Sequence, residues 1–200
     1  MATSENVSRA RLLRAAIEYV GEHGVGDLSL RGLAAGIGTS HRMLIYHFGS
    51  KEALLIEVIR AVEQQQRELL ANFEIDPSLS PAEITRRMWR HLSDPALWPN
   101  ERLFFEMYGQ ALQRRPHTVD FLDDVVEAWL EPIAALRREQ GVPPDTARAQ
   151  ARLDLAITRG LLLDLLATGD RRGVTEAMEQ FGALYEAWSD NLPVNSGEKR

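Results

Sequence analysis

Cysteine is absent from the 200 residues of this chain, which excludes disulfide bonds and thiolate metal sites. Long hydrophobic runs are also missing. The most apolar segment, Gly160–Gly169, is interrupted by Asp164 and falls short of the roughly 20 residues that cross a bilayer. The N-terminus has no apolar signal core. With 44% hydrophobic and 26% charged residues, the composition is that of an ordinary soluble globular protein, for which we expect a cytoplasmic location and no membrane partner.

Motifs for catalysis, cofactor binding and metal binding are lacking too. The sequence has no GxSxG nucleophile elbow, no phosphate-binding glycine loop and no HExxH zinc motif. His91 and His117 have no partner at metal-ligand spacing, and Asp123-Asp124 is more typical of a helix surface than of a catalytic pair of carboxylates. We therefore expect no enzyme activity, no cofactor and no metal.

Charge is unevenly distributed along the chain. The net charge is −6, which by itself argues against nucleic acid as a partner. Residues 1–51, however, contain six Lys/Arg and four Asp/Glu, so this head carries +2 and the remainder −8. A mildly basic head on an acidic body is compatible with DNA binding, because only the contacting face has to meet phosphate.

Hydrophobic periodicity predicts an all-α fold of about nine helices, with no strand-like alternation and no internal repeat. We expect a three-helix N-terminal domain (1–50), a helical ligand-binding and dimerisation domain (51–190) and a disordered tail (191–200). Residues 1–7 are also expected to be disordered. Besides two short helices within 29–49, the helices are expected at about 8–23, 50–73, 81–93, 100–113, 117–140, 144–168 and 172–190.

The segment Ser29–Lys51, SLRGLAAGIGTSHRMLIYHFGSK, predicts two short helices at a sharp turn and the start of a longer one. Serines 29, 40 and 50 stand at the three N-cap positions, and Gly38 supplies a turn residue that can adopt a positive φ. The second helix is polar and partly basic. Helices this short are not stable alone, and their arrangement as a helix-turn-helix suits insertion into the major groove of DNA.

The last two predicted helices have apolar faces that a partner could cover. The final helix repeats large apolar residues at spacings of 4, 3, 4 and 3 from Val174 to Trp188, as in a heptad seam. Two such helices per subunit can form a four-helix interface between two copies, although the same pattern fits the core helices of a monomer. The residues assigned to the interface are Gly160, Leu161, Met178, Phe181, Tyr185 and Trp188.

The run Tyr46-His47-Phe48-Gly49-Ser50-Lys51-Glu52, preceded by LRGLA and a glycine turn, resembles the DNA-binding domain of TetR (tetracycline repressor) family regulators. The resemblance covers about residues 8–60. It implies an all-α homodimer that binds a palindromic operator through its N-terminal helices and holds a small-molecule inducer in its C-terminal domain. An inducer that favours another separation of the two heads would weaken DNA binding.

The resemblance also implies roles for single residues. Tyr46 and Lys51 match the family's phosphate contacts, and His47 and Ser40 match further ones, in agreement with their hydrogen-bonding chemistry. The other candidate DNA-binding residues are Arg31, Thr39 and His41.

The sequence departs from the family at two positions in the recognition helix. Ile45 replaces a common tyrosine, which removes one expected phosphate contact. Arg42 replaces a small residue, and its guanidinium could bind guanine O6 and N7 bidentately or lie along a phosphate.

Large side chains are concentrated in the body of the chain. Most lie at helical spacing and would be core residues in any helical domain, but as a group they predict a pocket for an apolar or aromatic small molecule. Acidic groups nearby could instead favour a cation against an aromatic wall. The residues assigned to ligand binding are Trp89, Phe105, Tyr108, Phe121 and Trp129.

The function predicted from the sequence is a DNA-binding transcriptional regulator, most simply a ligand-responsive repressor. Its expected partners are double-stranded DNA, a second copy of the chain and a small-molecule effector. The first alternative is a helical binding or scaffold protein whose helix-turn-helix makes protein contacts, and the second, less favoured by the missing motifs, is an enzyme. Operator binding that is abolished by changes at Tyr46 and Lys51 would separate the scaffold protein from the regulator.

Overall fold

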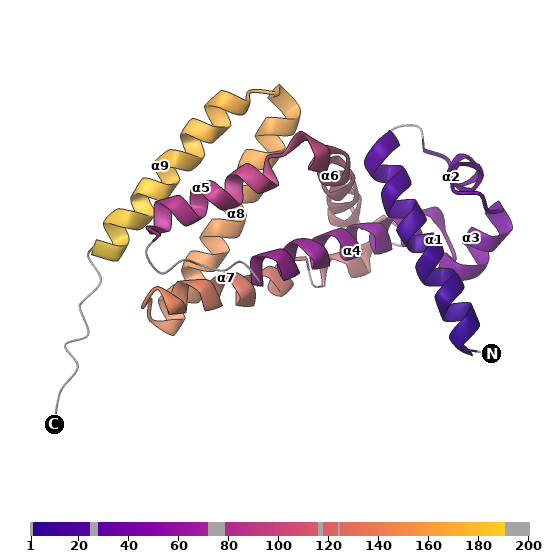
Figure 1. Ribbon diagram of the computed structural model, residues 1–200, viewed down its shortest axis with the longest axis horizontal. Helices are drawn as coiled ribbons and strands as arrows, with labels where there is room; N and C mark the ends of the chain where they lie inside the picture. The colour runs from indigo at the N-terminus through magenta and orange to yellow at the C-terminus, as the bar shows by residue number, and fades with distance from the viewer. Residues whose placement is uncertain (1, 25–27, 72–78, 116–117, 124, 191–200) are drawn as a thin grey trace. The chain divides into compact units, whose positions relative to one another are not determined.

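The structure, a computed structural model, describes residues 2–24, 28–71, 79–115, 118–123 and 125–190. These ranges contain nine α-helices, two short 3-10 segments and no strand, which confirms the expected all-α fold (Figure 1). The predicted tail, 191–200, lies outside them. The chain divides into two compact units, the first made of Met1–Asn72 and Asp94–Trp129 and the second of Phe73–Ser93 and Leu130–Arg200.

The first unit begins with a longer helix than the sequence predicted. Helix α1 spans Ala2–His23, so the expectation that residues 2–7 are disordered was wrong. Neither glycine nor proline occurs among these residues, and the helix therefore continues towards the N-terminus. The other elements of this unit are α2 (Leu30–Gly36), α3 (His41–Phe48), α4 (Lys51–Ala71), η1 (Pro95–Leu97), α6 (Trp98–Leu112) and η2 (Val119–Leu122).

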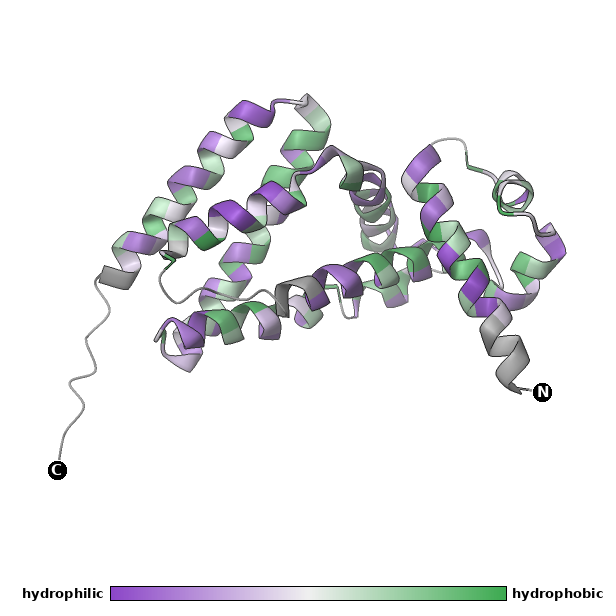
Figure 2. Cartoon of the chain, in the orientation of Figure 1, coloured by the Kyte–Doolittle hydropathy of each residue, from purple (hydrophilic) through white to green (hydrophobic). Residues whose placement is uncertain are grey.

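One hydrophobic core joins the helix-turn-helix to later parts of the chain. It runs from α1 through α2, α3 and α4 to α6 and η2, and it includes Leu33, Leu44, Leu103 and Phe121. In Figure 2 the N-terminal half of α4 is largely hydrophobic, whereas its next part is hydrophilic. The three short N-terminal helices are therefore stabilised by apolar burial that extends well beyond residue 50.

The segment between α6 and the next helix differs from the prediction of one helix over 117–140. Only Val119–Leu122 forms the 3-10 segment η2, and α7 begins at Glu127 and ends at Glu139. The break lets both Phe121 and Val125 reach the core of the first unit, where they are buried. Core packing therefore decides this boundary, because the local sequence contains no helix breaker.

The second unit consists of α5 (Pro81–Leu92), most of α7, α8 (Pro144–Thr168) and α9 (Arg171–Asp190). Gly182 of α9 approaches α5 so closely that an added Cβ would lie 3.3 Å from Ala82. Gly169, with φ +71°, ends α8 in the left-handed conformation and allows the chain to reverse. Within the described part of the chain, none of the helices combines the length and apolarity needed to span a bilayer.

The apolar seam of α9, apart from the exposed Trp188 at its end, is covered by helices of its own chain. Met178, Phe181 and Tyr185, which the sequence assigned to a dimer interface, are buried inside the second unit. Periodicity identified the buried face of α9 correctly, but the helices that cover this face belong to the same chain. These three side chains are therefore not available to a second subunit.

A buried ion pair also holds the second unit together. The Arg137 Nε and Nη2 groups of α7 donate to Asp154 Oδ2 of α8 at 3.0 and 2.8 Å. The guanidinium carbon lies 3.7 Å from the centre of the Tyr185 ring of α9. The pair thereby joins three helices.

Candidate nucleic-acid interface

The turn between α2 and α3 is built by backbone hydrogen bonds around a glycine. Thr39 N–H donates to Ala34 O at 2.8 Å, and Gly38 has φ +68°, as the sequence predicted for this position. Gly36 lies against α1, where an added Cβ would be 2.1 Å from the Tyr19 ring. Gly38 therefore permits the turn between the two short helices, and Gly36 permits the close packing of α2 against α1.

Serine caps begin each helix of the interface. The hydroxyls of Ser29, Ser40 and Ser50 accept hydrogen bonds from backbone N–H groups three residues later, at 3.0, 3.2 and 3.0 Å. A capping hydroxyl can still donate its own proton, so Ser40 can reach a phosphate oxygen while it caps α3. The caps confirm the helix starts predicted from the sequence.

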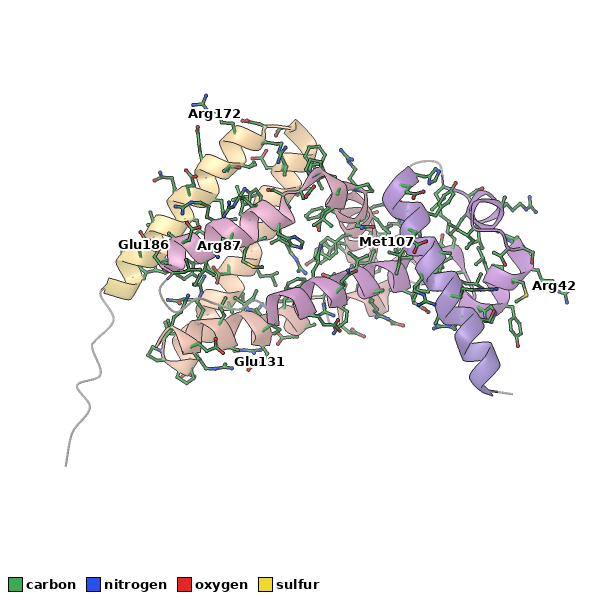
Figure 3. The ribbon with its side chains drawn as sticks, in the orientation of Figure 1. Arg42, Arg87, Met107, Glu131, Arg172 and Glu186 are labelled. Atoms are coloured by element: carbon green, nitrogen blue, oxygen red, sulfur yellow. The ribbon has the colours of Figure 1, made fainter. Side chains whose placement is uncertain are left out.

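The recognition helix α3 buries one face and exposes the other. Leu44 and Phe48 are buried in the core, whereas His41, Arg42 and Tyr46 are exposed. Arg42 projects outward from α3 (Figure 3). Hydrogen-bonding side chains on the outer face of a helix-turn-helix are the groups that can reach base edges and phosphates.

Two further predicted DNA contacts flank this face. Arg31 is exposed on α2, and Lys51 is partly exposed in the first turn of α4. The unpaired N–H groups of a helix N-terminus attract anions, and an ammonium group there adds a full positive charge. Lys51 is therefore well placed for a phosphate oxygen. Thr39, in the turn itself, is partly exposed.

His47 differs from the other predicted contacts. Its Nε2 atom is buried and has no hydrogen-bond partner among the described residues. Its ring packs against the rings of Tyr46 and Phe48, with centroids 5.0 and 6.3 Å apart. In this conformation only the Nδ1 side of the ring can serve as a phosphate contact.

Arg9 was missed by the sequence analysis. Its Nε donates to the backbone carbonyl of His47 at 3.3 Å, its guanidinium pairs with Glu57 of α4, and its Cζ lies 5.1 Å from the centre of the Phe48 ring. One side chain of α1 thus touches the C-terminal turn of α3 and the first half of α4. No local pattern could have revealed this role, because the contacts join positions about 40 residues apart.

The predicted ligand-binding residues fall in two places. Phe105, Tyr108 and Phe121 surround Phe104 in the first unit, with ring centroids 5.2 to 5.8 Å from that of Phe104. Trp89 belongs to the second unit, where its indole N–H donates to Thr175 Oγ1 at 3.2 Å. The structure therefore brings three of the five residues together in one aromatic cluster.

Trp129, the fifth residue, lies beside a buried carboxylate. Its indole N–H donates to Glu63 Oε1 at 3.0 Å, and Arg67 lies over its ring at 5.6 Å. Glu63 stands in a polar stretch of the sequence, yet its carboxylate is buried against this indole. Nowhere in the described ranges do three or more His, Cys, Asp or Glu side chains gather in a way that could bind a metal ion.

The two short helices α2 and α3 are joined by a turn at Gly38. The exposed face of α3 carries polar side chains, and Lys51 follows it in α4. These features define a helix-turn-helix DNA-binding protein. Residues 12–58 match the family described as bacterial regulatory proteins, tetR family. This match and the curated relatives show a DNA-binding transcriptional regulator whose head, over residues 12–58, is a DNA-binding domain of the tetR family.

Relatives extend the similarity beyond the head. The chain is 26% identical over 182 residues to the HTH-type transcriptional regulator EthR of Mycolicibacterium smegmatis, a match that covers 83% of this chain and 77% of that protein. A crystal structure of a transcriptional regulator from a Rhodococcus species aligns with a TM-score of 0.72 and 20% identity, covering 93% of this chain and 100% of the other. The multidrug binding protein EbrR, complexed with imidazole, aligns with a TM-score of 0.60 and 27% identity over 89% of each chain.

Proposed function

We propose that the chain acts as a homodimeric repressor that binds a palindromic operator through α2 and α3 and releases it when a small molecule binds. The observation that carries this proposal is the exposed face of α3, where Arg42 and Tyr46 stand beside the cationic start of α4 at Lys51. Two such heads related by two-fold symmetry match two half-sites about 34 Å apart, one turn of DNA. A dimer seated there would block polymerase.

The residues of the head divide into two roles. Tyr46, Lys51 and Ser40 hold phosphates, together with His47 through its Nδ1 side, and these contacts set the register of the head on the duplex. Arg42 reads guanine bidentately in the major groove. Arg31, Thr39 and His41 complete the contact surface.

We assign dimerisation to the outer faces of α8 and α9. Leu163 is 51% exposed on α8 and Leu184 is 53% exposed on α9, and Trp188 adds further apolar surface. Gly160 lies on the same side of α8 as Leu163, and beyond the backbone of α8 itself an added Cβ there would meet no described atom within 4 Å, so a partner helix can approach closely. Two helices from each subunit would then form a four-helix interface.

The effector is assigned to the first unit. Its aromatic cluster of Phe105, Tyr108 and Phe121 offers apolar contacts, and Trp129 carries a polar partner in Glu63. A largely apolar or aromatic molecule would suit these side chains, in line with the drug-binding role in the name of EbrR. The effector would act by its higher affinity for a dimer whose heads do not match the half-site spacing.

Selection of bound sequences from random duplex DNA, followed by titration on the winner, tests the proposal. We expect a palindrome bound at nanomolar concentration. Lys51→Ala should weaken binding to all sequences alike and reduce the salt dependence by about one phosphate contact, whereas Arg42→Ala should relax the preference at one base pair by ~1–3 kcal/mol. Absence of enrichment, tested also after refolding to remove any bound effector, would reject operator binding.

A further inference from the structure

An aliphatic side chain lies on the exposed surface of α3, and the contact roles proposed above leave it unused. Ile45 is 39% exposed. It follows Arg42 by three residues and His41 by four, and it directly precedes Tyr46. Because residues three and four apart share a face of an α-helix, Ile45 stands beside Arg42, which projects outward in Figure 3.

The surroundings of Ile45 decide what kind of partner it meets. Arg42 and His41 share its face of α3, Lys51 lies in the next helix, and residues 1–51 carry a net charge of +2. An apolar protein groove would have to bury these polar and charged groups as well, which is costly. An anionic partner that also carries a small apolar group can pair with Arg42 and Lys51 and at the same time cover the Ile45 side chain.

DNA has one such feature in its major groove. The C5-methyl group of thymine is the apolar mark that distinguishes this base, and aliphatic side chains pack on it. Isoleucine has no donor or acceptor beyond its backbone, so it cannot take over the hydrogen bond of a tyrosine to phosphate. Its contribution to DNA binding must therefore come from apolar contact.

We propose that Ile45 is a specificity-determining residue that packs on the C5-methyl group of a thymine next to the base pair contacted by Arg42. The inference rests on the proposed operator binding and deepens it, because it states what a half-site contains. Each half-site carries a thymine, or another pyrimidine methylated at C5, adjacent to the guanine that Arg42 reads. The departure from tyrosine at position 45 then gives the head a base contact in place of a phosphate contact.

Replacement of thymine by deoxyuridine in the selected operator tests this role, since it deletes one methyl group and leaves every hydrogen bond in place. With the wild-type protein, one thymine position per half-site should lose about fourfold in affinity when substituted, and about 16-fold when both half-sites are substituted. With Ile45→Ala, the same substitutions should have no effect, because the side chain that packs on the methyl group is gone.

Two control variants separate this contact from its neighbours. Met43 is 38% exposed on the same helix but lies nearly opposite Ile45 around the axis, so Met43→Ala should keep the sensitivity to deoxyuridine. Thr39 stands in the turn before α3 and also carries a methyl group, so Thr39→Ser, which deletes that methyl group and keeps the hydroxyl, should keep the sensitivity as well.

The outcomes distinguish the inference from the proposed function. An operator that binds tightly but tolerates deoxyuridine at every thymine would overturn the role of Ile45 alone. The role of Ile45 would also be overturned if the sensitivity of binding to deoxyuridine persisted in Ile45→Ala or disappeared in Thr39→Ser. Failure to select any operator would reject the proposed function, and the role of Ile45 with it.

Discussion

The buried pair of Arg137 and Asp154 leads to the sharpest prediction for stability. The two residues are 4% and 8% exposed, and Arg137 also donates to Gln140 Oε1 at 3.0 Å. Arg137→Met leaves the Asp154 carboxylate buried without its cation, and it removes the guanidinium from the face of the Tyr185 ring. Breaking a buried pair from one side costs ~3–5 kcal/mol, a large part of the roughly 5–15 kcal/mol that stabilises a folded protein.

The double variant Arg137→Met, Asp154→Leu provides the control. It removes both charges and fills the space with apolar atoms, so its free energy of unfolding should lie within about 1 kcal/mol of the wild type, or above it. Urea denaturation followed by circular dichroism at one fixed protein concentration measures both variants, because an associating protein changes its apparent stability with concentration. A cost below about 1 kcal/mol for Arg137→Met, or a double variant as unstable as the single one, would refute the reasoning.

The pH dependence checks the same pair independently. Burial raises the pKa of the Asp154 carboxyl above its ordinary value, and the neighbouring Arg137 offsets this effect in part. Between the ordinary pKa of the unfolded chain and the raised pKa of the folded state, Asp154 holds a proton when folded and has released it when unfolded. The contribution of this group to stability therefore falls as the pH rises through that interval. Arg137→Met removes the offset and widens the interval. Its destabilisation should therefore shrink at acidic pH, and the double variant should show no such change. An identical cost at pH 5 and pH 8 would contradict this account.

Three further perturbations test the head and the interface. Gly36→Ala should destabilise the protein by ~1–3 kcal/mol in urea denaturation, because the new Cβ would meet the Tyr19 ring at 2.1 Å; a neutral result would show that the ring moves aside freely. Arg9→Ala should weaken operator binding by about 5- to 30-fold. The slope of log affinity against log salt concentration should not change, since the guanidinium is engaged within the protein; a slope smaller by about one would make Arg9 a phosphate contact instead. Leu163→Glu should convert a dimer to a monomer in light scattering, while Leu112→Glu, at a still more exposed leucine of the first unit, should not; a dimer that survives Leu163→Glu would place the interface elsewhere.

Most of the head could be predicted because its signals are local. The serine caps, the glycine at the turn and the inward spacing of Leu44 and Phe48 act within a few residues of the chain. The structure confirms each of them. The exposed face of α3 follows from the same periodicity, since a helix that buries one stripe must present the opposite one to solvent.

Other features depend on contacts between residues far apart in the sequence, and the local sequence pattern does not predict such contacts. Arg9 reaches residues 38 and 48 positions away, and Glu63 is buried by an indole 66 positions along the chain. A polar residue in a polar stretch looks solvated until its partner is placed. The break before α7 has the same origin, because Phe121 and Val125 are drawn into a core built mainly by earlier helices.

The sequence by itself determined the helical fold, the helix-turn-helix and the face that each amphipathic helix buries. Only the tertiary structure decided what covers those faces. In α9 the heptad-like spacing correctly marked Met178, Phe181 and Tyr185 as buried, yet the covering surface comes from the same subunit. The physical reason is that apolar burial is non-directional: periodicity reports that a surface leaves water, and it does not identify the surface that replaces the water.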